Sequence, residues 1–155
     1  MKSTFDTLYY RFSKLMDKHS VNLMRIALAI VYIWFGVLKV IGISPAEELV
    51  EKTVYWFKPK IFIPILGICE MIIGFGLLIK RFVPITIVLL LLHMMVTFFP
   101  IFIVEKTCFT IFPYEPSLIG QYIIKNLVLI CGALVIAGKS NQSYIAKNSL
   151  TIGNK

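Results

Sequence analysis

The sequence predicts an all-α integral membrane protein built as a bundle of four transmembrane helices. Of its 155 residues, 58% are hydrophobic and only 15% are charged, and the mean hydropathy is +0.83, a composition typical of membrane proteins. Runs such as VPITIVLLLLHMMVTFF are apolar on every face, whereas the strands of a membrane β-barrel alternate apolar and polar residues. We therefore expect helices, in a single membrane domain over residues 1–155.

Four segments are long enough to cross a bilayer. A hydrocarbon core about 30 Å thick requires about 20 apolar residues in a helix, and the segments that meet this requirement are 23–43, 61–79, 82–104 and 118–137. The first is not a cleaved signal peptide, because more than twenty residues of mixed polarity precede it and no small-residue cleavage site follows it.

Two further segments have the pattern of helices that lie on the membrane surface. In residues 1–20, apolar residues recur at three- and four-residue spacing opposite a charged face, which predicts an interfacial helix. Residues 45–57 predict a short amphipathic helix in the first outer loop, with Ser44 as N-cap, Pro45 at its first position and Glu47 completing a capping box. Partner docking would also explain these apolar faces, but membrane anchoring requires fewer assumptions.

The remaining segments are connections. Residues 105–117 predict an irregular outer loop that ends at a Ser117 cap. Residues 139–155 predict a polar, frayed tail.

The distribution of Lys and Arg predicts the orientation. Ten of them fall on one side of the four spans: Lys2, Arg11, Lys14, Lys18, Arg25, Lys80, Arg81, Lys139, Lys147 and Lys155. Because short loops rich in these residues stay in the cytoplasm, we expect both termini to be cytoplasmic, and the absence of an organelle transit pattern favours a bacterial inner (plasma) membrane. The formal charge of +8 is thus mainly an orientation signal, and nucleic acid is discarded as a partner because no basic run with interleaved aromatics stands apart from the membrane.

Each span carries a polar stripe, and within these stripes lie candidate ligand or proton-site residues: Tyr32, Lys39, Glu70, His93, Gln121 and Lys125. An ion in hydrocarbon is costly unless it is paired or hydrated, so such residues are expected to face the bundle interior. At a rise of 1.5 Å per residue, Lys39 lies about 6 Å, Lys125 about 10 Å and Glu70 about 13 Å below the outer ends of their spans, with His93 near the midplane. Arg25 at the cytoplasmic end is expected to be an anchor that reaches lipid headgroups.

These depths predict a Lys39–Glu70 salt bridge, with Lys125 sharing the same carboxylate. Two lysines on one glutamate leave excess positive charge, so either one lysine is neutral or an anionic ligand completes the site. The glycines of the stripes, Gly36, Gly67 and Gly74, are interpreted as structural, for close helix packing. A network that only holds the helices in register is the competing interpretation for the whole cluster.

A resemblance to a known family lies in three segments: RIALAIVYIWFGVLKV in the first span, EMIIGFG in the second and GQYIIKNLVLI in the fourth. They are similar to DoxX-type membrane proteins, four-helix proteins that include DoxD-like and YkgB-like branches, over about residues 20–140. Carried over residue by residue, the resemblance points to Arg25, Gly36, Lys39, Glu70, Gly74, Lys125 and Asn126.

The resemblance implies a link to redox chemistry. Some members of the family are subunits of quinone-linked oxidoreductases, including thiosulfate:quinone oxidoreductase, while others accompany redox or stress-response proteins. Quinone is then the candidate cofactor, since Lys39, Lys125 or Asn126 can donate to its carbonyls and Glu70 or His93 can relay protons.

Thiol and metal chemistry are disfavoured. Cys69, Cys108 and Cys131 form no CxxC pair, and two histidines without an HxxxH spacing do not predict a metal site. No self-sufficient catalytic motif is present, so the protein is at most an oxidoreductase subunit.

Three functions of different class therefore remain open. The leading one is a small subunit of a redox or quinone-linked membrane complex, with the lipid bilayer, a redox protein and a second copy of the chain as candidate partners. The alternatives are a carrier for a small anion or lipid-like molecule, and a non-catalytic membrane scaffold or assembly factor.

Overall fold

The computed structural model describes residues 4–44, 47–54 and 58–152, with only the backbone described at 47, 48, 52 and 141–152. Four helical stretches are long and apolar enough to cross a membrane, which agrees with the predicted all-α, multi-pass membrane protein. These are α1 (Thr4–Val40), α3 (Pro59–Leu78), α4 (Val83–Ile103) and the stretch Leu118–Ser140, formed by α6 (Leu118–Ile124) and the first part of α7 (Asn126–Ile152). The bounds of α3 and α4 lie within two residues of the predicted spans.

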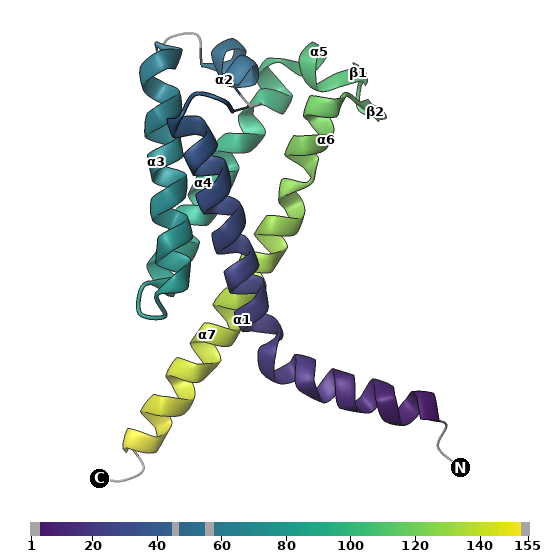
Figure 1. Cartoon of the computed structure of the whole chain (residues 1–155), viewed down its shortest axis with the longest axis vertical. Coiled ribbons are helices and arrows are strands. Elements are labelled where there is room, and N and C mark those ends of the chain that lie inside the picture. Colours follow the sequence, from purple (N-terminus) through teal and green to yellow (C-terminus); the bar gives the residue numbers. More distant parts are fainter. Residues whose placement is uncertain (1–3, 45–46, 55–57, 153–155) are drawn as a thin grey trace.

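The first span and the predicted interfacial helix are one continuous helix rather than two. Figure 1 shows that the N-terminal part of α1 points away from the bundle and that the helix bends sharply before it joins the other helices. We call residues 4–20 the arm. Its aromatic and aliphatic side chains are exposed, and Phe5, Leu8, Tyr9 and Phe12 line a shallow apolar hollow, as the amphipathic pattern predicted.

The other end of α1 stops at Val40, three residues before the predicted end of the span. Gly42 has φ +74°, and the backbone N–H groups of Gly42 and Ile43 donate to the carbonyls of Lys39 and Leu38. This pair of bonds is a Schellman motif, in which a left-handed glycine satisfies the last carbonyls and turns the chain out of the helix. Lys39 therefore lies in the last turn of α1.

Helices α1 and α3 pack unusually closely because glycines face each other. A Cβ placed on Gly36 would lie 2.6 Å from the carbonyl oxygen of Gly67, and one on Gly67 would lie 2.6 Å from that of Gly36. Two turns further along α3, Gly74 lies against the backbone of Ala29 and Ile33. Small residues in both helices thus allow the two backbones to touch, which is the usual basis of tight packing between membrane helices.

All four spans contribute to one apolar core. Its buried residues are Leu28, Ala29 and Tyr32 of α1, Ile73 and Leu77 of α3, Val83, Ile87, Leu90 and Met94 of α4, and Ala133 and Ile136 of α7. The opposite faces of these helices expose large apolar side chains, as is expected of surfaces in contact with lipid.

The fourth span is interrupted at Lys125, a feature that the sequence did not predict. The backbone N–H of Lys125 donates to the carbonyl of Gln121, four residues earlier, as in a regular α-helix. The N–H of Val128 instead donates to the carbonyl of Lys125, only three residues earlier. Lys125 keeps right-handed helical angles, so the interruption is a local tightening and not a break in direction. Beyond the bundle α7 continues to Ile152, whereas a frayed tail was expected; residues 153–155 lie outside the described residues.

The outer connections are more regular than the sequence predicted. Between the third and fourth spans, α5 (Glu105–Cys108) leads into an antiparallel pair of short strands, β1 (Phe109–Ile111) and β2 (Glu115–Pro116), where an irregular loop was expected. The predicted Ser117 cap is present, because its Oγ accepts a hydrogen bond from the N–H of Gly120 at 3.2 Å.

The predicted outer amphipathic helix 45–57 is described only in part. It contains α2 (Glu47–Thr53), which lies at the same end of the molecule as α5 and the two strands (Figure 1). Pro45, Ala46 and residues 55–57 lie outside the described residues.

Candidate functional site

Glu70 of α3 lies at the centre of the candidate site. The Nζ of Lys39, on α1, donates hydrogen bonds to both carboxylate oxygens, at 2.7 Å and 3.0 Å, and the two side chains are only 9% and 8% exposed. The salt bridge predicted from the sequence is therefore confirmed. An ion pair of this kind avoids the large cost of burying either charge alone.

Close helix packing makes this ion pair fit. Gly67 lies one turn before Glu70 on α3, and a Cβ at this position would lie 2.8 Å from the Cβ of Lys39. A larger residue would push the lysine side chain away from the carboxylate. The glycine therefore positions the ion pair as well as packing the helices.

His93 of α4 extends the ion pair. Its Nε2 lies 3.2 Å from the Oε1 of Glu70, and its side chain is 8% exposed. The angles of this contact do not meet those of a hydrogen bond, so this buried nitrogen has no hydrogen-bond partner among the described residues. On the other side of the ring, Nδ1 lies 3.4 Å from the hydroxyl oxygen of Tyr32, and the two rings meet edge to face with centroids 5.6 Å apart.

Lys39, Glu70, His93 and Tyr32 thus form a continuous chain of polar groups contributed by α1, α3 and α4, which we call the buried polar cluster. An imidazole between a hydroxyl and a carboxylate can hold its proton on either nitrogen. If Tyr32 donates to Nδ1, the proton of a neutral ring is on Nε2 and faces Glu70. The arrangement can therefore store a proton or pass one between the two ends of the chain.

Lys125 does not join the cluster, which corrects the expectation that two lysines share Glu70. Lys125 is exposed, and its Nζ lies 5.1 Å from the centroid of the Tyr122 ring, within the range of a cation–π contact. The helix that it follows, α6, packs against α4, α5 and β2. Among the residues that the structure describes, Glu70 consequently has one lysine partner, and the excess positive charge expected from two lysines does not arise there.

Asn126 and Gln121 also make their contacts outside the cluster. The amide nitrogen of Asn126 donates to the hydroxyl of Thr97 at 3.4 Å, and that hydroxyl donates to the carbonyl of Met94. Gln121 is exposed, and its amide donates to the carbonyl of Pro116 at 3.4 Å. Asn126 therefore connects α7 to α4, and Gln121 connects α6 to β2.

The three cysteines lie apart from the cluster. Cys69 and Cys131 are exposed, while Cys108 in the outer connection is fully buried against the carbonyl of Pro100. Burial raises the pKa of the Cys108 thiol, because a thiolate would lose its hydration there. A raised pKa makes this thiol a poor nucleophile at neutral pH.

One feature that sequence reasoning missed is a cavity of about 410 Å³ at the opposite end of the bundle, where α1 bends. It is lined by Asp17, Lys18, Val21, Asn22, Arg25, Lys80, Val83, Ile136, Lys139 and Ser140. We call it the basic cavity, since four of these side chains are cations and one is a carboxylate. The lysines were interpreted from the sequence as an orientation signal and Arg25 also as an anchor that reaches lipid headgroups. Only the fold shows that these residues surround one space.

Comparisons of the chain with protein-family models, with curated proteins and with solved structures found no match.

Proposed function

We propose that this protein is a small subunit of a redox-linked membrane complex, in which the buried polar cluster holds and passes protons. The observation that carries the proposal is His93, a buried imidazole placed between the hydroxyl of Tyr32 and the carboxylate of Glu70. The resemblance of three segments to DoxX-type proteins supports the redox part of the proposal, since members of that family accompany quinone-linked enzymes.

The ion pair has a definite role in such a site. In a low-dielectric interior a lone carboxylate would take up a proton rather than remain charged, and it would then be a poor proton acceptor. Lys39 donates to both oxygens of Glu70 and offsets its charge, while the same carboxylate faces the ring of His93. Proton transfer along the chain then requires only small rotations of the imidazole, because its neighbours lie within or just beyond hydrogen-bonding distance.

Of the three quinone donors that the sequence indicated, Lys125 and Asn126 remain the candidates. Lys39 is engaged by Glu70, whereas the ammonium of Lys125 lies at the lipid-exposed surface over the Tyr122 ring, with Asn126 next in the chain. Lys125 and Asn126 can donate hydrogen bonds to the carbonyls of a headgroup, and Tyr122 offers it an aromatic neighbour. A bound quinone would supply two-electron, two-proton carrier chemistry.

The experiment is native mass spectrometry of the protein extracted gently from its own membrane, together with the quinone-reduction rate of whatever complex co-purifies. We expect a bound quinone and an oxidoreductase partner with the parent chain. Lys125→Gln should lose the quinone, because the carbonyl loses its charged donor, whereas Lys106→Gln in the exposed outer connection should retain it. His93→Leu should keep the quinone and the partner but slow the turnover of the complex. Met95→Leu, at an exposed position of the same helix, should leave the turnover rate unchanged.

A clean homo-oligomer without quinone or partner would overturn the redox proposal and favour the carrier or the scaffold. Full turnover by the His93→Leu complex would instead remove His93 from the proton path.

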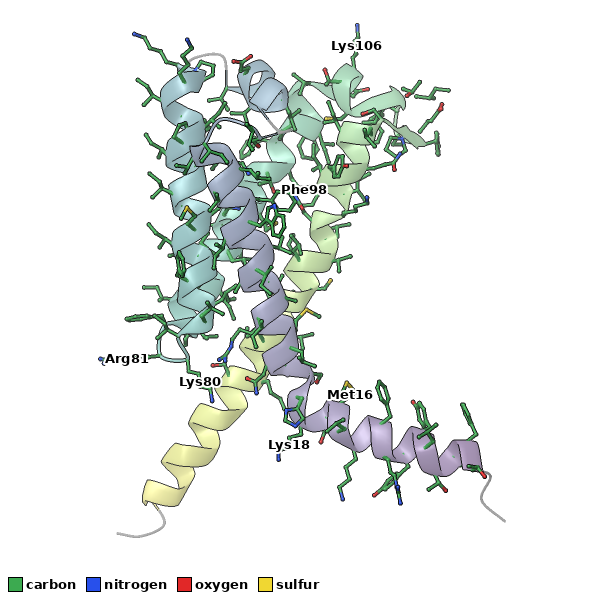
Figure 2. All side chains as sticks on the ribbon, viewed as in Figure 1. Met16, Lys18, Lys80, Arg81, Phe98 and Lys106 are labelled. Carbon is green, nitrogen blue, oxygen red and sulfur yellow. The ribbon has the colours of Figure 1, made fainter. Side chains whose placement is uncertain are left out.

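We also infer that both termini face the cytoplasm of a bacterial cell. Lys18, Lys80 and Arg81 lie at one end of the bundle and Lys106 at the other (Figure 2), and basic residues favour the cytoplasmic side. In a background with the three native cysteines replaced, Lys106→Cys should react with a membrane-impermeant maleimide in intact cells. Arg81→Cys should react only after the cells are permeabilised, and the reverse pattern would invert the orientation.

A further inference from the structure

We propose that the basic cavity binds the phosphate group of an anionic phospholipid headgroup. The cavity is independent of the buried polar cluster, since it lies at the opposite end of the spans, where α1 bends into the arm. Its binding properties can therefore be tested whether or not the redox proposal holds.

Arg25 is the residue that points to an oxyanion. Its Nε is buried and has no hydrogen-bond partner among the described residues, although the side chain lines the cavity. A buried, charged donor without an acceptor is costly, and guanidinium groups are satisfied best by two oxygens of one phosphate or carboxylate. An anion in the cavity would supply the missing acceptor.

The charges around Arg25 favour the same ligand. Lys18 comes from the bend of α1, Lys80 from the turn between α3 and α4, and Lys139 from α7, so cations from three separate parts of the chain converge on one space (Figure 2 shows Lys18 and Lys80 at this end). Asp17 is the one carboxylate in the lining, and it leaves a clear excess of positive charge. Basic pockets of this kind between membrane helices are typical sites for anionic lipid headgroups.

Two observations favour a lipid over a free phosphate ion. The cavity lies at the ends of the apolar spans, which is the depth of lipid phosphates, and its lining also contains the aliphatic side chains Val21, Val83 and Ile136. A soluble anion has no apolar surface to bury against these side chains, whereas the glycerol and the first methylenes of a lipid have such surface. A lipid held here would also bridge the arm and the bundle, because Lys18 belongs to one and Lys80 to the other.

The test uses the full-length protein in an uncharged detergent, with lipid binding followed by native mass spectrometry and by the thermal unfolding midpoint. Phosphatidylglycerol should bind and raise the midpoint, phosphatidylcholine should do so much less because its choline carries a positive charge, and inorganic phosphate should have little effect. Arg25→Gln should weaken binding of phosphatidylglycerol about tenfold, through loss of a charge-assisted pair. Arg81→Gln is the matched control, since Arg81 is exposed at the same end but does not line the cavity.

Lys80→Gln is a second variant of the basic cavity, which tests the proposal even if Arg25→Gln does not fold. Lys80 is exposed, so its replacement should leave the fold intact and still weaken lipid binding several-fold. Equal affinity for phosphatidylglycerol in the Lys80→Gln and Arg81→Gln proteins would overturn the proposal. Stabilisation by inorganic phosphate as strong as that by the lipid would also overturn it, in favour of a site for a soluble anion.

Discussion

Glu70→Ala should lower the free energy of unfolding by about 3–5 kcal/mol, because it leaves the ammonium of Lys39 buried without its partner. Lys39 is only 7% exposed, so its ammonium has little access to water. The measurement is reversible unfolding of parent and variant in the same mixed micelles, with the fraction folded followed by circular dichroism.

The matched control is the double variant Lys39→Met/Glu70→Ala. Replacing both partners of a buried ion pair by apolar groups is often close to neutral, so the double variant should recover much of the stability lost in Glu70→Ala. A Glu70→Ala protein as heat-stable as the parent would show that the pair does not stabilise the fold. Equal losses in the single and double variants would mean that the effect comes from the cavity left at position 70 and not from the unpaired lysine.

Gly36→Ala should be nearly as disruptive, although it adds only one methyl group. That methyl would lie 2.6 Å from the carbonyl oxygen of Gly67 and 3.0 Å from the backbone nitrogen of Met71, and backbone atoms cannot move aside as a flexible side chain can. Helices α1 and α3 would have to separate, at a cost of about 2 kcal/mol or more. The same unfolding experiment measures this loss.

Gly138→Ala is the control for Gly36→Ala. A Cβ at Gly138 meets nothing within 4 Å, so the substitution adds the same methyl without a clash, and it should be neutral or stabilise α7 by up to about 1 kcal/mol. If the two substitutions changed the free energy of unfolding equally, the backbone contact between α1 and α3 would not be the cause of the loss in Gly36→Ala.

The two predictions are linked through the geometry of the site. Gly36 lies one turn before Lys39 on α1, and Gly67 lies one turn before Glu70 on α3, so the same contact that brings the backbones together aligns the ion pair. A helix separation in Gly36→Ala should therefore also weaken the Lys39–Glu70 bridge. Combining Gly36→Ala with Glu70→Ala should then cost less than the two separate losses together, because part of each loss is shared.

The sequence by itself determined the number of candidate spans, and it predicted a depth for each charge. Both depend on distance along one helix, because hydropathy is a local property and each residue advances the chain by a constant rise. Lys39 and Glu70 were therefore predicted as a pair, and Ser117 was predicted as a cap, before any helix was placed beside another.

Only the tertiary structure decided which charges meet at a given depth. Lys125 has a depth similar to that of Lys39, yet it lies over Tyr122 at the exposed surface, while His93 and Tyr32 turn toward each other in the interior. The direction in which a side chain points and the helix that it faces depend on how the four helices pack. Counting residues along one helix gives neither. The cations around Arg25 come from α1, from the turn after α3 and from α7, so the basic cavity likewise depends on how the helices pack and is visible in the fold and not in the sequence.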